Sequence, residues 1–252
     1  MNGSGDTDRP RAIPGDGPAA DRRRSSALIV AAIASIIVGA AIVMGLDVVS
    51  ARSDAGHLHR TISEYGLGAQ RWVFAAGVML VAAGSALAAL VMVRRGILSV
   101  SSTTARASAL WVLGLVVVAV VPQQNWEDSA TIGLGGAAHR LGTVVAFVSA
   151  PVAVLSAARP WLCDVRWRRW ARVAFGCGVV SVLTFVPVVY AFTVGLLTAT
   201  PWWEAVTLGY VERSIVVVEI VAVLALVLWA RAVAADTTGP EFDRGNRTSV
   251  QR

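Results

Sequence analysis

The chain has 252 residues, of which 56% are apolar and 15% are charged, and its mean hydropathy is +0.64. These values exclude a soluble globular domain of ordinary composition. The net charge of +6 would suggest a nucleic-acid partner in a soluble protein. Here the positive residues lie in tails and loops between apolar runs, so no nucleic-acid partner is predicted.

Six apolar stretches account for most of the chain. A helix needs about 20 mostly apolar residues to cross a ~30 Å hydrocarbon core. The stretches are Ala27–Val49, Trp72–Val93, Ala107–Val121, Ala138–Ala157, Val173–Leu197 and Ser214–Val233. The sequence therefore predicts an all-α fold, a bundle of six transmembrane helices over residues 26–235. The polar tails, 1–25 and 236–252, have almost nothing apolar to bury and are expected to be disordered.

The arginines indicate an orientation. All 22 basic residues are arginine, and if the helices alternate, seventeen of them lie on one side of the membrane. Basic residues are retained on the cytoplasmic side. Both termini are therefore predicted to be cytoplasmic, with membrane lipids as the surroundings and the plasma membrane of a bacterium as the expected location.

Within the spans, small residues and prolines indicate local geometry. Gly77 and Gly84 lie on one face of the second stretch and would allow close helix packing. Pro151 and Pro187 interrupt the fourth and fifth stretches, where kinks are expected. The loop 161–172 mixes tryptophans with arginines. It is predicted to lie at the inner surface, either as an ordinary basic loop or as a contact for anionic lipid.

Ionisable residues in or near the spans are the candidate functional residues, because burying a charge in the membrane is costly. We predict a polar cluster in the outer half of the bundle, formed by Asp47, Glu64, His139, Arg140, Glu212, Arg213 and Glu219. Glu219 is the acid deepest in a span, and Glu212 lies two helical turns earlier on the same face. Glu219 is expected to pair with Arg140, Arg213 or His139, or else to stay uncharged. Such a carboxyl could tie helices together, carry protons or cations, or line a pocket.

Enzymatic motifs are absent from the sequence, which favours a protein that is not an enzyme. His57 and His59 have a spacing that could hold zinc in a strand. Two histidines in a polar loop are more often ordinary loop residues, so no metal site and no cofactor are predicted. No Gly-x-Ser-x-Gly elbow and no phosphate-binding Gly-x-x-x-x-Gly-Lys occurs.

Three short segments resemble a known family. They are Ile62–Gly66 running into Arg71–Gly77, then Val121-Pro122 followed by Ala138–Gly142 with Phe147 and Pro151, and finally Gly209–Arg213. In this order they resemble the bacterial six-helix membrane family catalogued as domain of unknown function 998, over about residues 27–233. The family's usual acid after the third-helix proline is replaced by Gln123. The resemblance implies a membrane protein with no established activity, and it includes Glu64, His139, Glu212 and Arg213.

The sequence thus predicts a multi-pass membrane protein of unknown biochemical activity. One alternative is a small transporter that uses Glu219 to couple protons or cations. The other is a membrane hydrolase that uses His139 and nearby acids.

Overall fold

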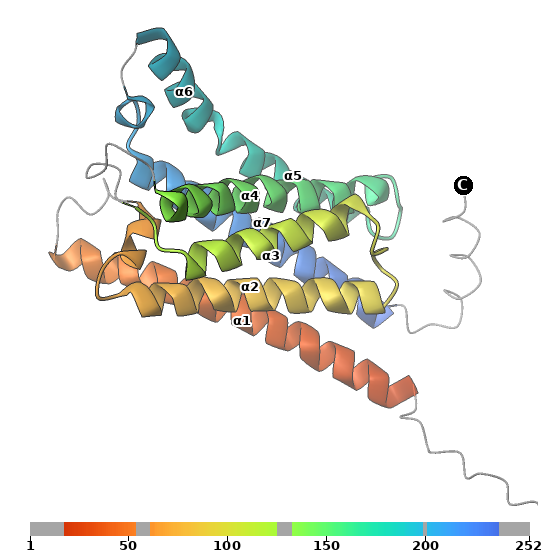
Figure 1. The fold of residues 1–252 in the computed structure, drawn as a ribbon. Coiled ribbons are helices and arrows are strands. Elements are labelled where there is room, and N and C mark those ends of the chain that lie inside the picture. Colours follow the sequence, from red (N-terminus) through yellow and green to blue (C-terminus); the bar gives the residue numbers. More distant parts are fainter. Residues whose placement is uncertain (1–17, 54–60, 125–132, 199–200, 237–252) are drawn as a thin grey trace, which may run out of the picture.

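The computed structural model describes residues 18–53, 61–124, 133–198 and 201–236, and all regular structure in these ranges is helical (Figure 1). The α-helices are α1 Pro18–Ser53, α2 Arg71–Arg94, α3 Thr103–Val120, α4 Leu134–Ala158, α5 Arg168–Leu183, α6 Val186–Thr198 and α7 Leu208–Asp236. Three short 3-10 helices are η2 Ile62–Gly66, η3 Arg159–Trp161 and η4 Trp202–Glu204.

Six helical segments of the described chain are long and apolar enough to cross a membrane, and α5 with α6 forms one of them. The predicted all-α bundle of six spans is confirmed, and the protein is a multi-pass membrane protein in contact with lipid. α1 begins at Pro18, so the helix extends into the segment 1–25 that was expected to be disordered. Residues 1–17 and 237–252, the rest of the two tails, lie outside the described residues.

Glycines bring α1 and α2 into close contact, as the spacing of Gly77 and Gly84 predicted. A Cβ atom on Gly39 would lie 2.5 Å from the carbonyl oxygen of Gly77. One on Gly84 would lie 2.7 Å from the carbonyl oxygen of Ala32. Because only glycine lets backbones approach this closely, these positions fix how α1 lies against α2. Gly114 has the same function between α3 and α4, where its Cβ would lie 2.6 Å from the carbonyl oxygen of Gly142.

α7 passes through the bundle and packs against α1, α2, α4 and α5 (Figure 1). Its buried apolar residues contribute to both core clusters of the protein. At the end of the bundle away from η2, Trp229 packs edge-on against Trp161 with ring centroids 6.1 Å apart, and Trp167 is buried in the same cluster. Trp170 and Arg168, Arg169 and Arg172 are exposed around this cluster.

The two prolines have different effects. Pro151 lies inside α4, which continues through it without a break. Near Pro187 the predicted single span is divided, with α5 ending at Leu183 and α6 starting at Val186. α6 leans away from the other helices in Figure 1, and most of its large apolar side chains are exposed.

Candidate functional site

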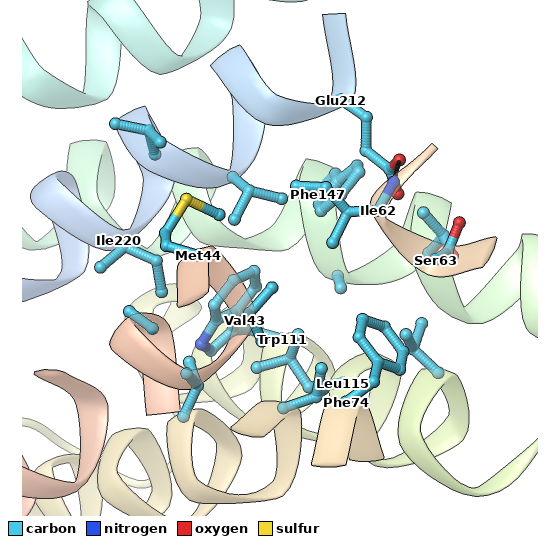
Figure 2. Close-up of a pocket in the computed structure, with 18 of the residues that line it drawn as sticks. Val43, Met44, Ile62, Ser63, Phe74, Trp111, Leu115, Phe147, Glu212 and Ile220 are labelled. Atoms are coloured by element: carbon cyan, nitrogen blue, oxygen red, sulfur yellow. Dashed lines mark hydrogen bonds between the residues drawn. The ribbon is translucent and has the colours of Figure 1, made fainter. Parts of the chain in front are cut away.

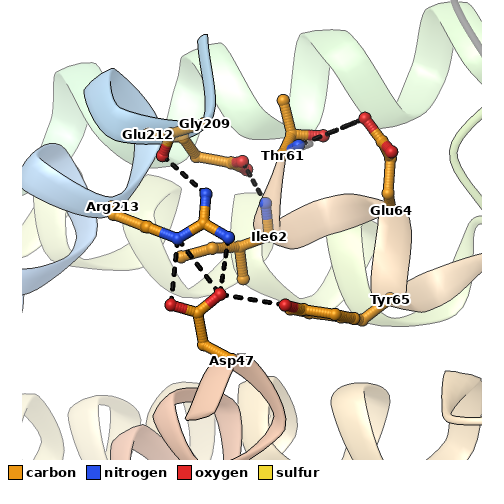
Figure 3. Close-up of polar contacts among 8 residues, drawn as sticks. All are labelled: Asp47, Thr61, Ile62, Glu64, Tyr65, Gly209, Glu212 and Arg213. Atoms are coloured by element: carbon orange, nitrogen blue, oxygen red, sulfur yellow. Dashed lines mark hydrogen bonds and ion pairs between the residues drawn. The ribbon is translucent and has the colours of Figure 1, made fainter. Parts of the chain in front are cut away.

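An ion pair joins the first and last spans at the η2 end of the bundle. Asp47 lies near the end of α1, and Arg213 lies in the second turn of α7. The Arg213 Nε donates to both Asp47 carboxylate oxygens, at 3.1 and 2.9 Å, and Nη2 donates to Oδ1 (Figure 3). The side chains are only 12% and 18% exposed. A two-pronged guanidinium–carboxylate pair of this kind fixes direction as well as distance, so it sets the relative position of α1 and α7.

Tyr65 connects η2 to this ion pair. Its hydroxyl donates to Asp47 Oδ1 at 2.9 Å (Figure 3). The pKa of the Tyr65 phenol is raised above its ordinary value, mainly by burial. A hydrogen bond with Ser50 lowers this pKa, and Asp47 raises it. The phenol therefore keeps its proton at neutral pH and remains a donor to the carboxylate.

Two glutamates hold η2 at its beginning. Glu212, next to Arg213 on α7, accepts a hydrogen bond from the backbone N–H of Ile62 (Figure 3). Glu64 accepts hydrogen bonds from the backbone N–H and the hydroxyl of Thr61, at 3.1 and 3.0 Å, and so caps η2 locally. We call Asp47, Tyr65, Glu212 and Arg213, together with the backbone of Ile62, the polar clamp. The Glu64–Thr61 contacts shape η2 but are not part of the clamp.

Directly beneath the polar clamp lies a cavity of about 240 Å³. Helices α1, α2, α3, α4 and α7 surround it, and Ile62 and Ser63 of η2 cover one end (Figure 2). Its lining is almost entirely apolar; Figure 2 labels Val43, Met44, Phe74, Trp111, Leu115, Phe147 and Ile220 among the residues that line it.

The few polar groups of the lining already have partners. The Ser63 hydroxyl donates to the Thr61 hydroxyl, and the Thr143 hydroxyl donates to the carbonyl oxygen of His139. The Trp111 Nε1 donates to the Ser85 hydroxyl at 3.1 Å. Glu212 is engaged with Ile62. A water molecule needs two to four polar partners, so this lining favours an apolar occupant.

The cavity reaches the lateral surface of the bundle, between α1 and α7; we call this line of contact between the two helices the seam. Val217 and Val221 of α7 line the cavity, yet they are 47% and 50% exposed. Across the seam, Ala40 and Met44 of α1 also line it and are partly exposed. Because these spans lie in a membrane, the mouth of the cavity opens toward lipid rather than toward water.

His139 joins α4 to α3 rather than to the polar clamp. His139 lies near the start of α4, where its Nδ1 is 2.7 Å from the carbonyl oxygen of Val121 at the end of α3. A carbonyl only accepts, so Nδ1 carries a proton and the ring ties α4 to α3. Arg140 is the next residue on α4 and is half-buried.

The expected pairing of Glu219 with Arg140, Arg213 or His139 is wrong. Glu219 is fully buried in α7, and neither carboxyl oxygen has a hydrogen-bond partner within the described part of the chain. Arg213 lies six residues earlier, so the two side chains leave the helix about 120° apart. Arg213 is engaged with Asp47, and His139 with Val121.

The hydrolase alternative gains no support. Among residues 18–53, 61–124, 133–198 and 201–236, no group of three His, Cys, Asp or Glu side chains could hold a metal ion. His57 and His59 lie outside the described residues. The transporter alternative gains no support either, since it rests on Glu219 and no relay partner is seen for it in the described ranges.

Sequence reasoning did not identify the role of Tyr65 or the cavity. Tyr65 lies in one of the segments that carry the family resemblance, beside Glu64, and that placement was the available signal. The cavity has no local signal, because its lining comes from five helices whose apolar residues look alike in the sequence.

No curated protein and no solved structure matches the chain. A family model, described as "Protein of unknown function (DUF998)", matches residues 29–229, which lies within the predicted resemblance of about 27–233 and reaches into all six spans. The chain therefore belongs to the DUF998 family, whose function is unknown.

Proposed function

We propose that this protein binds the acyl chain of a membrane lipid in the cavity between α1, α2, α3, α4 and α7. The observation that carries the proposal is the direction of the opening. The cavity is closed by η2 and the polar clamp at one end, and its mouth lies along Val217 and Val221, which are exposed on the side of the bundle. An acyl chain can enter this mouth sideways from the bilayer.

The energetics favour an occupant. An empty apolar cavity costs roughly 24 cal/mol per Å³. For about 240 Å³ this amounts to about 6 kcal/mol. Apolar cavities of about 150 Å³ stay dry and take up molecules of the size of benzene. A flexible apolar chain fills the space without needing polar partners, which the lining does not offer.

Trp111 provides a direct test, because it lines the cavity and is only 4% exposed. In bilayer discs containing lipids with brominated acyl chains, we expect strong quenching of the Trp111 emission, measured as wild type minus Trp111→Phe. Quenching by bromine requires near contact, so it reports a chain inside the cavity.

Val217→Phe and Val221→Phe block the mouth and should restore the Trp111 emission. Leu228→Phe is the matched control, since Leu228 is 40% exposed on α7 but does not line the cavity. Unquenched Trp111 in a wild-type sample whose exposed Trp170 is quenched would refute the proposal.

We further propose that both termini are cytoplasmic in a bacterial plasma membrane, with loop 161–172 at the inner surface. The arginine distribution supports this orientation. The exposed Arg168, Arg169 and Arg172 would then contact anionic headgroups at about 1 kcal/mol each.

Epitope tags at the two termini test the orientation. Protease added outside intact cells should leave both tags uncut and should digest them after the cells are permeabilised. A tag placed after Gln124, between α3 and α4, is the control and should be cut from outside. Digestion of either terminal tag in intact cells would contradict the proposed orientation.

A further inference from the structure

The cavity beneath the polar clamp lies in one half of the membrane-spanning region. On α7 its lining begins at Glu212, near the start of the span Leu208–Val233, and ends at Val221, in the middle of that span. On α3 the lining runs from Trp111, in the middle of the helix, to Val118, two residues before its end. The cavity therefore occupies the depth of one leaflet, which is the leaflet at the η2 end of the bundle.

The cavity is closed toward the membrane surface and open toward the middle of the bilayer. Ile62 and Ser63 of η2 lie with Glu212 at the closed end, and both η2 residues are buried (Figure 2). Among the described lining residues, the exposed ones are Val217 and Val221. They follow Glu212 by five and nine residues, about 8 and 14 Å along α7. The mouth thus lies at the deep end of the cavity.

The position of the mouth indicates the direction from which a chain enters. A chain of the leaflet at the η2 end runs from its headgroup toward the middle of the bilayer, so it would have to reverse direction at the mouth to fill the cavity. A chain of the opposite leaflet reaches the mouth with its methyl end leading. It then continues in the same direction into the cavity, so the geometry favours a lipid of the opposite leaflet.

The depth of the cavity indicates how long this chain is. The hydrocarbon core is ~30 Å thick, so a chain that fills one leaflet ends after about 15 Å, at the level of the mouth. Reaching the closed end takes about 14 Å more along α7. A shorter chain could reach it only if its polar headgroup sank into the hydrocarbon, which is costly. The chain that fits is therefore longer than one leaflet.

We propose that the cavity selects a lipid with a very long acyl chain, whose headgroup lies in the leaflet away from η2 and whose methyl end lies beneath η2. This inference rests on the proposed acyl-chain site and adds the chain length and the leaflet of its lipid.

Val118 of α3 is the residue that sets the accepted length. It lines the cavity seven residues beyond Trp111, on the same face of α3 and about 10 Å closer to the closed end. Only a chain that has passed Trp111 reaches Val118. A larger side chain at this position shortens the cavity and leaves the mouth open.

Competition between lipids tests the chain length. In bilayer discs of palmitoyl-length lipids with brominated chains, unbrominated lipid is added until half of the Trp111 emission returns, again measured as wild type minus Trp111→Phe. A very-long-chain phosphatidylcholine should achieve this at about a tenfold lower mole fraction than a palmitoyl-length one, equal to about 1.4 kcal/mol. Val118→Phe should remove this advantage while Trp111 is still quenched.

Val120→Phe is the matched control, since Val120 is 62% exposed at the end of α3 and does not line the cavity. It should keep the advantage of the long chain. Equal mole fractions for the two lipids in the wild type, with Trp111 quenched, would overturn the selection of long chains and leave the acyl-chain site standing. Absence of quenching would refute the acyl-chain site itself.

Vesicles with brominated lipid in one leaflet test the leaflet, and they need no variant in the cavity. Each vesicle holds a single protein, and a tag after Gln124, beyond the η2-side end of α3, sorts the vesicles by orientation. A very-long-chain lipid brominated midway along its chain is exchanged into the outer leaflet. It should quench Trp111 when η2 faces the vesicle interior and leave Trp111 unquenched when η2 faces outward. Quenching in the outward-facing vesicles would overturn the proposed direction of entry.

Discussion

Replacing Arg213 by methionine is expected to lower the free energy of unfolding by about 3 kcal/mol, because it leaves Asp47 largely buried without its cation. The value is at the lower end of the range for buried pairs, since both side chains keep some exposure. The Tyr65 hydroxyl would remain as a partner of Asp47. Unfolding by denaturant in mixed micelles, followed by circular dichroism, measures the loss.

A double-mutant cycle separates the ion pair from simple packing. Asp47→Leu combined with Arg213→Met should recover most of the stability, because two apolar side chains replace two charges. Tyr65→Phe should cost only about 1 kcal/mol, the value of one hydrogen bond. Additive losses in the double variant would show that Asp47 and Arg213 are not coupled.

The clamp also connects stability to the proposed binding. Asp47 and Arg213 join α1 to α7 at one end of the seam along which the cavity opens. Arg213→Met should therefore widen the mouth as well as destabilise the bundle. Without its ion pair, α7 would still be joined to η2 by the contact of Glu212 with Ile62, but this contact does not reach α1.

The sequence was sufficient for the fold because each span is long and apolar, a signal that does not depend on its neighbours. The glycine contacts of α2 were also predictable, since Gly77 and Gly84 lie two turns apart on one face. The break at Thr184 and Phe185 was only partly predictable. Pro151 and Pro187 look equivalent in sequence, yet α4 stays continuous while α5 ends.

The polar groups were predicted as a set but not in their pairing. Asp47 and Arg213 are 166 residues apart, and either could have had several partners. Glu219 was assigned a partner because a buried charge was assumed to find one. The structure instead buries it without a hydrogen-bond partner in the described residues. Pairing between helices depends on rotation and register, which apolar periodicity alone does not determine.

The close contact of α1 with α2 gives the second large expected effect. Gly39→Ala should lower the free energy of unfolding by about 1–3 kcal/mol, the usual cost of overpacking. The added Cβ would lie 2.5 Å from the Gly77 carbonyl oxygen and 2.9 Å from the Val81 backbone nitrogen. Backbone atoms cannot rotate away as a flexible side chain can, so α1 itself must move.

Gly45→Ala on the same helix is the matched control, because its Cβ would have nothing within 4 Å. Alanine favours the helix by up to about 1 kcal/mol relative to glycine, so this variant should be as stable as the wild type or more stable. The same unfolding measurement compares the two. Equal stability of both variants would mean that α1 and α2 do not pack at this distance. A loss confined to Gly39→Ala would show that the glycine contact fixes the position of α1 against α2. The next residue of α1, Ala40, lines the cavity.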